Sequence, residues 1–274
     1  MRKLLSVVAL GACLSVGIQV DARADAPSAV QSKQQSGTVI NLAGKQRMLT
    51  QKMSKEALFV AKGIDAKKNK ANLAKTVALF DKTLKGLING DSSLNLPKTK
   101  NKEILAQLQK VTDLWKSFKT KIEKNDLKAI ASENIPLLKN MNAAVQMYAK
   151  ASGSKLDPAM AKTINLAGKQ RMLTQKMTKE LLLVANGIDA DANKENAKKT
   201  VALFEKTLND LINGTKDDGI KKQLEVVKKL LAEYKPIIAN VDTSSEALEK
   251  ANKLNLPLLK EMNKAVKMYE ASIK

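Results

Sequence analysis

Apolar and polar positions along the chain follow a helical pattern. Ala, Leu, Lys, Met, Gln and Glu, which favour helix, dominate the sequence, whereas Gly and Pro are scarce. Capping and turn-forming residues interrupt the pattern at Gly63, at Asn89-Gly90 and around Asn125-Asp126, and again at corresponding places in the second half of the chain. The pattern predicts helices over residues 28–62, 66–89, 101–123, 126–151, 159–186, 190–213, 218–240 and 244–272.

The second half of the chain repeats the first. The stretch INLAGKQRMLTQKM at 40–53 returns without a substitution at 164–177, and TVALFDKTLKGLING at 76–90 returns in close form at 200–214. The first repeat has a longer loop at 91–100. Each repeat contains the signals for four helices joined by short connections, so the sequence predicts an all-α fold of two tandem four-helix bundles with up-down-up-down topology.

A Gly, Ser and Pro-containing segment separates the repeats and is expected to be a linker. Pro136 and Pro257 fall inside the fourth helix of each repeat, where we expect a break or a kink because proline removes a backbone hydrogen bond. The expected divisions are a signal peptide at 1–24, a first domain at 27–151, a linker at 152–158 and a second domain at 159–274.

The N-terminal segment has the composition of an export signal. A basic start is followed by an apolar run from Leu4 to Val20 and by small residues in an A-x-A pattern, which predicts cleavage near Ala24 and a periplasmic mature protein. Leu10-Gly11-Ala12-Cys13 also resembles a lipoprotein cleavage box, so lipidation at Cys13 is the alternative. No other apolar run is long enough to cross a bilayer.

The composition excludes several kinds of chemistry. The chain has no histidine and a single cysteine, Cys13, so histidine bases, Ser-His-Asp triads and the usual zinc ligands are excluded, and we expect no enzyme, no cofactor and no metal site. Methionine clusters can bind copper, but the spacing of the repeated methionines favours core filling. A net charge of +21 favours anionic partners. Nucleic acid is not expected, because aromatic residues are few and a binding motif is absent.

On a helical wheel, the repeated stretch has two distinct faces. One face is apolar and is expected to enter the core of its own bundle; it contains Leu42, Leu49, Met53 and Val60. The other is small and polar, with an arginine in its middle; it contains Ile40, Ala43, Gly44, Arg47, Thr50, Gln51, Ser54 and Leu58. A glycine costs about 1 kcal/mol of helix stability relative to alanine, so Gly44 indicates the close approach of another helix.

Arg47 and its counterpart Arg171 are the only arginines beyond the N-terminal segment. Arginine presents a planar fork of donors and is weakly hydrated, which suits it to hold an oxyanion in a partly buried site. No acidic residue lies three or four positions from either arginine, which argues against an ordinary surface ion pair. The candidate ligand-binding residues are Arg47, Arg171, Gly44, Gly168, Thr50, Thr174, Gln51 and Gln175.

INLAGKQRMLTQKM, together with NLPLLKEMNKAVKMY from Asn255, resembles the signature of the PilJ-type sensor domain, the extracytoplasmic part of some type IV pilus chemotaxis transducers. The block is also similar to the helical domain of nitrate and nitrite sensor kinases, whose motif helices pair in a dimer and hold one small anion between two arginines. The resemblance covers both repeats and implies this role for Arg47 and Arg171. A second basic residue of the nitrate motif falls at Lys52 and Lys176, which the wheel places about 140° from the arginines.

These inferences lead to one hypothesis and two alternatives. The hypothesis is an exported sensory module whose two repeats form an intrachain pseudo-dimer, bind a nitrate-like oxyanion between the motif helices and present it to a membrane receptor or sensor protein. The first alternative is an interaction protein that docks a receptor or pilus component through the small-residue face and binds no small molecule. The second is an enzyme using carboxylate or lysine chemistry; near the motif only Glu56 and Glu180 are available, and we expect these to face water or make a polar contact.

Overall fold

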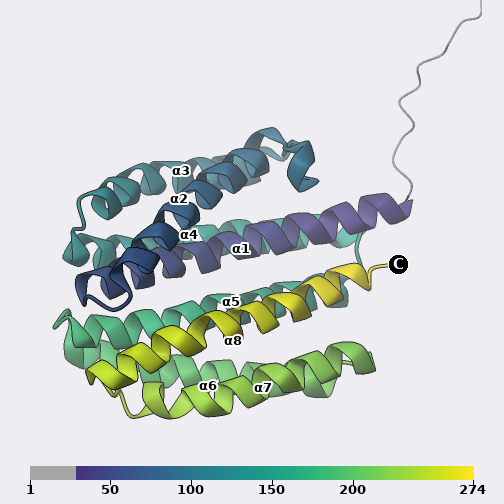
Figure 1. Ribbon diagram of the computed structural model, residues 1–274. Helices are drawn as coiled ribbons and strands as arrows, with labels where there is room; N and C mark the ends of the chain where they lie inside the picture. The colour runs from purple at the N-terminus through teal and green to yellow at the C-terminus, as the bar shows by residue number, and fades with distance from the viewer. Residues whose placement is uncertain (1–28) are drawn as a thin grey trace, which may run out of the picture.

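A computed structural model describes residues 29–274, so the expected signal peptide and Cys13 lie outside the described residues. The described chain is all-α, with its helices packed in two groups of four (Figure 1), as the sequence predicts. The first group is α1 (Ala29–Ala61), α2 (Ala66–Asn89), α3 (Lys102–Glu123) and α4 (Leu127–Ala151). The second group is α5 (Pro158–Ala185), α6 (Ala190–Gly214), α7 (Asp218–Ala239) and α8 (Ser245–Ala271). Two short 3₁₀ helices were not foreseen: η1 (Ser92–Leu94) and η2 (Ser152–Ser154).

Side-chain caps explain where most of these helices begin. In each capped helix, the residue before the first turn accepts a hydrogen bond from the backbone N–H three positions on, which satisfies a donor that the helix cannot pair internally. The capping residues are Asn101, Asp126, Asp157, Asp217 and Ser244. After α1 and α5 the chain turns at Gly63 and Gly187, with φ of 73° and 69°, a conformation that favours glycine.

The expected breaks at Pro136 and Pro257 do not occur, because α4 and α8 each continue through their proline. Both helices are held firmly just before that residue. Asn134 Nδ2 donates to Thr50 O and Ser54 Oγ at 2.9 Å, and Asn255 Nδ2 donates to Thr174 O at 3.1 Å. Tertiary contacts at these asparagines therefore outweigh the loss of one hydrogen bond inside the helix.

Each group of four helices encloses an apolar core. On α3, Trp115 packs against Phe80 of α2 with ring centroids 4.4 Å apart, and its Nε1 donates to Asp81 Oδ1 at 2.6 Å. Met53 and its counterpart Met177 are fully buried, in agreement with a core-filling role for the repeated methionines. Within residues 29–274, no helix combines the length and the apolar character that a membrane span requires.

The two groups meet along α1 and α5, which lie side by side in the middle of the molecule (Figure 1). We call this contact the seam. Arg47 Nη2 donates to Asn165 O at 3.1 Å, and Lys62 Nζ donates to Ala185 O at 3.1 Å, across sequence separations of 118 and 123 residues. Both separations are close to the spacing of the repeats, so α1 and α5 run parallel and in register, and equivalent residues meet across the seam.

Candidate functional site

Both faces of the repeated stretch are covered in the structure. Leu49 and Met53 enter the core of the first group as expected, whereas Leu42 and Val60, at the edges of the same stripe, are only half-buried. On the small polar face, the residues from Ile40 to Leu58 are buried because α5 packs directly against them. The seam thus encloses the face on which the candidate ligand-binding residues lie.

Arg47 and Arg171 face each other across the seam, with exposed fractions of 2% and 1%. Arg47 Nη1 donates to Asn142 Oδ1 of α4 at 2.7 Å, and its Nη2 donates across the seam to Asn165 O at 3.1 Å. Arg171 repeats this arrangement with Asn263 Oδ1 of α8 at 2.8 Å, and with Asn41 O across the seam at 3.0 Å. Each arginine therefore binds its own group through one nitrogen and the opposite helix through another.

The two glycines of the motif make room for these guanidinium groups. A Cβ placed on Gly44 would lie 3.3 Å from Arg47 Nη2 and 3.8 Å from Arg171 Nη2. The same atom on Gly168 would lie 3.5 Å from Arg171 Nη2 and 3.6 Å from Arg47 Nη2. Since one point on either helix is close to both guanidinium groups, the two cations are near neighbours, and a side chain at either glycine would crowd them.

The arginine pair is electrostatically unusual. Burial lowers the pKa of Arg47, and the nearby Arg171 charge lowers it further. Burial also lowers the pKa of Arg171, which the charge of Glu270 partly opposes. Among the described residues, neither guanidinium forms an ion pair, and both Nε atoms are buried without a hydrogen-bond partner. Two like charges thus lie together in the interior with spare donors, an arrangement suited to an anion.

Glu270 breaks the symmetry of the site. Its carboxylate accepts hydrogen bonds from Thr38 Oγ1 and Asn41 Nδ2, each at 2.5 Å, and so links α8 to α1 beside Arg171. The corresponding position in the first repeat is Ala149, which follows Tyr148 as Glu270 follows Tyr269. One side of the arginine pair therefore has a carboxylate nearby that the other side lacks.

The remaining candidate residues form a separate layer further along the seam. Gln51 Nε2 donates to Asn134 Oδ1 at 2.7 Å, and Gln175 Nε2 donates to Asn255 Oδ1 at 3.0 Å. Thr50 and Thr174 donate to backbone carbonyls within their own helices. The structure therefore brings Arg47, Arg171, Gly44 and Gly168 together, while the threonines and glutamines support the neighbouring layer without a hydrogen bond to either guanidinium group.

Two lysines that sequence analysis missed complete this second layer. Lys55 Nζ crosses the seam to Asn255 Oδ1 at 2.7 Å, and Lys179 Nζ crosses it in the other direction to Asn134 Oδ1 at 3.1 Å. Burial lowers the pKa of Lys55 to about 7 and that of Lys179 to about 8, against opposing effects of Glu56 and Glu180. The only sequence signal was the matching Lys-Glu pair in the two repeats.

Glu56 and Glu180 make polar contacts and do not face water. They are 1% and 2% exposed. Each forms an ion pair with the lysine one turn earlier, Lys52 or Lys176, and Glu56 Oε2 also accepts from Thr76 Oγ1 at 2.9 Å. These lysines are therefore engaged away from the arginine pair, as the helical wheel indicates. The sequence analysis did not single out Asn142 and Asn263, which accept hydrogen bonds from the two arginines, although both lie in duplicated blocks of the sequence.

The fold and the seam define an all-helical tandem domain with a buried arginine pair. The family model described as "Type IV pili methyl-accepting chemotaxis transducer N-term" (PilJ) matches residues 29–144 and 158–261. The chain belongs to this PilJ family, the sensory domain of chemotaxis transducers, which confirms the resemblance seen in the sequence. It is also similar to methyl-accepting chemotaxis protein McpN of Pseudomonas aeruginosa, with 30% identity over 152 residues; the match covers 53% of this chain and 26% of McpN.

Proposed function

We propose that this chain is a sensory module that binds one small oxyanion between Arg47 and Arg171 in the seam. The observation that carries the proposal is the pairing of two buried guanidinium groups without a carboxylate bound to either among the described residues. Buried charge is costly unless an opposite charge compensates it. An anion between the two arginines would supply that compensation and would also tie the two repeats together.

The donors left on the pair suit a small planar oxyanion. A guanidinium has five N–H donors, and the structure uses one on Nη1 and one on Nη2 of each arginine. The Nε–H of each arginine is unpaired. A nitrate-like anion with several acceptor oxygens would receive hydrogen bonds from both sides at once. Asn142 and Asn263 act as positioning residues, because each fixes one end of a guanidinium.

In this proposal the protein is exported and acts in the periplasm. There it would present the bound anion to a partner, either a membrane receptor or another sensor protein. The seam offers a physical means of signalling, since an anion held from both helices favours the arrangement in which α1 and α5 are close. In the alternative, docking through the small-residue face without a ligand, the seam would have to open first. Gly44, Thr50 and Gln51 are buried against α5, so that face is not exposed for docking.

The proposal is tested by calorimetric titration with nitrate, after a thermal-shift screen of small oxyanions. We expect one anion per chain and a large loss of affinity in Arg47→Lys and in Arg171→Lys, because lysine keeps the charge but loses the fork. One hydrogen bond to a charged group is worth about 1.5–3 kcal/mol, or roughly tenfold to over a hundredfold in affinity. The exposed Lys67→Gln is the matched control for a general change in cationic charge.

The double variant separates a shared site from independent ones. If both arginines hold the same anion, the loss in the double variant should be smaller than the sum of the two single losses. A stoichiometry of two, with each substitution silencing one site, would contradict the shared site. Unchanged oxyanion affinity in the double variant, or no response to any oxyanion in the screen, would remove the proposal and leave the docking alternative.

A further inference from the structure

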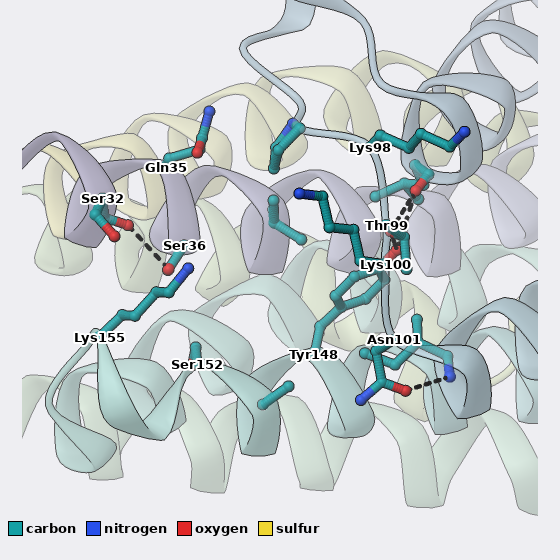
Figure 2. Close-up of a pocket in the computed structure, with 15 residues that line it drawn as sticks. Ser32, Gln35, Ser36, Lys98, Thr99, Lys100, Asn101, Tyr148, Ser152 and Lys155 are labelled. Carbon is teal, nitrogen blue, oxygen red and sulfur yellow. Dashed lines mark hydrogen bonds between the residues drawn. The ribbon is translucent and has the colours of Figure 1, made fainter. Parts of the chain in front are cut away.

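A second candidate ligand site lies at the end of the first group, beside the part of α1 that precedes the repeated motif. Here α1, the loop before α3, the end of α4 and η2 surround a pocket of about 380 Å³ (Figure 2). This volume lies at the lower end of the range for small-molecule sites. The pocket shares no lining residue with the arginine pair, so nothing about it depends on the proposed function.

The charge of this pocket has one sign. Lys98, Lys100 and Lys155 contribute to the lining, which contains no acidic residue. None of these lysines forms an ion pair among the described residues. In Figure 2, the side chains of Lys100 and Lys155 extend from opposite sides toward the middle of the pocket, whereas Lys98 points away from it. Two ammonium groups are thus aimed at one space from two separate segments.

The floor of the pocket is apolar and does not carry negative charge. Val39, Leu87 and Ile104 contribute apolar surface beside the ring of Tyr148. Burial raises the pKa of Tyr148 to about 12, so its phenol stays protonated at neutral pH. The Tyr148 hydroxyl shares a hydrogen bond of 2.7 Å with Thr99 Oγ1 and donates to Leu87 O at 3.2 Å, so its own polar needs are met. An apolar surface with cations at its edge favours a ligand that has an apolar body and an anionic group.

The second repeat provides an internal comparison. The equivalent pocket, of about 330 Å³, contains Thr215 and Tyr269, whose hydroxyls are hydrogen-bonded to each other as those of Thr99 and Tyr148 are. There, however, Asp210 and Asp217 contribute carboxylates beside Lys216, the counterpart of Lys100. The longer loop of the first repeat and the connection after α4 have thus produced a pocket with cations alone. The same scaffold carries two carboxylates and one lysine in the second repeat, and lysines alone in the first.

We propose that the pocket between α1, Lys100 and Lys155 is a second binding site, for a small organic carboxylate with an apolar body. The carboxylate lies between the two ammonium groups, and the apolar body packs on Tyr148 and its aliphatic neighbours. Such a ligand differs in class from the small inorganic oxyanion of the seam, which has no apolar part. The chain then carries two sites of different chemistry, one shared by both repeats and one confined to the first.

The test is calorimetric titration of the full chain with benzoate and hexanoate, and with benzamide as the uncharged match. We expect saturable binding of a carboxylate, weaker binding of benzamide, and at least tenfold lower carboxylate affinity in Lys100→Gln/Lys155→Gln. Lys216→Gln, which removes the equivalent charge from the other repeat, should bind the carboxylate as the wild type does. Both substituted lysines are exposed, so the double variant should fold, and circular dichroism checks that it does.

Three outcomes would overturn the proposal. These are the absence of saturable binding of either carboxylate to the wild type, equal loss of affinity in Lys216→Gln, and benzamide binding as tightly as benzoate. Amide chemical shifts locate the site: benzoate should move the resonances of Asn101 and Ser152, which line the pocket, and leave those of the seam in place. Arg47→Lys should bind benzoate normally, so failure of the seam site and failure of this site are distinguishable.

Discussion

Lys55 and Lys179 should make the stability of this protein rise with pH in the mildly alkaline range. Both lysines lie in the seam, where their exposed fractions are 6% and 4%. Each ammonium group donates a hydrogen bond to one asparagine side-chain oxygen in place of water. Lys55 has a pKa of about 7 in the folded protein, against an ordinary value of 10.5. That difference corresponds to about 5 kcal/mol of unfavourable charge burial below neutral pH.

The sign follows from counting protons. Above about pH 7 the folded state releases the Lys55 proton, and above about pH 8 that of Lys179, while the unfolded chain keeps both up to about pH 10.5. The unfolded state therefore binds more protons in this window, and the free energy of unfolding increases with pH by up to about 1.4 kcal/mol per unit for each lysine. From about pH 7 to about pH 9, the combined gain is about 4 kcal/mol.

The assay is urea denaturation followed by circular dichroism at several pH values between about 7 and 9. Lys55→Met/Lys179→Met removes the charges and keeps much of the packing volume. Asn255 Oδ1 would still accept from Gln175, and Asn134 Oδ1 from Gln51, so no acceptor is orphaned. We expect this variant to be more stable than the wild type near pH 7 and to lose most of the pH dependence.

The exposed Lys67→Met is the matched control, because it removes a lysine charge where water already solvates it. It should retain the slope of the wild type. A wild-type stability that stays level or falls between about pH 7 and 9 would refute the reasoning. The same conclusion would follow if the methionine double variant kept the full slope, because the buried lysines would then not be its source.

Three further substitutions test other contacts. Glu56→Gln leaves the partly buried Lys52 without its carboxylate and should lower the free energy of unfolding by about 3–5 kcal/mol in urea denaturation. A loss below about 1 kcal/mol would contradict this expectation. Gly44→Ala should favour the helix by up to about 1 kcal/mol yet weaken oxyanion binding in calorimetry, because its Cβ would lie 3.3 Å from Arg47 Nη2; equal or tighter binding would argue against this. Gly90→Ala, at φ 85° with Lys98 N 3.0 Å from the added Cβ, should lower the melting temperature, and an unchanged value would show that the loop adjusts freely.

Helices and their pairing into two groups could be predicted because their signals are local. Capping residues such as Asn101 and Asp157 and turn glycines such as Gly63 mark the helix ends in the sequence itself. The expected breaks at Pro136 and Pro257 were wrong because the contacts that decide the outcome there are not local. What keeps α4 and α8 continuous is their attachment to α1 and α5, which a sequence does not display.

The candidate site was predictable in part. Arg47 and Arg171 stand out because lysine is used at every other basic position beyond the N-terminal segment, and the glycines beside them indicate close helix packing. The crossed bonds of Lys55 and Lys179 join residues of different repeats, and they exist only once α1 and α5 are placed in parallel register. For the same reason, a lysine that looks like ordinary surface charge in the sequence can be among the most buried charges in the fold.

The Glu270–Ala149 difference shows what a single chain makes possible at this seam. When two copies of one polypeptide meet on a two-fold axis, every substitution appears on both sides, and the site between them must remain symmetric. Here the two sides are encoded separately, so a carboxylate could be introduced beside Arg171 alone. A seam of this kind can evolve to bind an asymmetric ligand, one whose two ends differ, in a preferred orientation. Such a change needs substitutions in only one half of the gene.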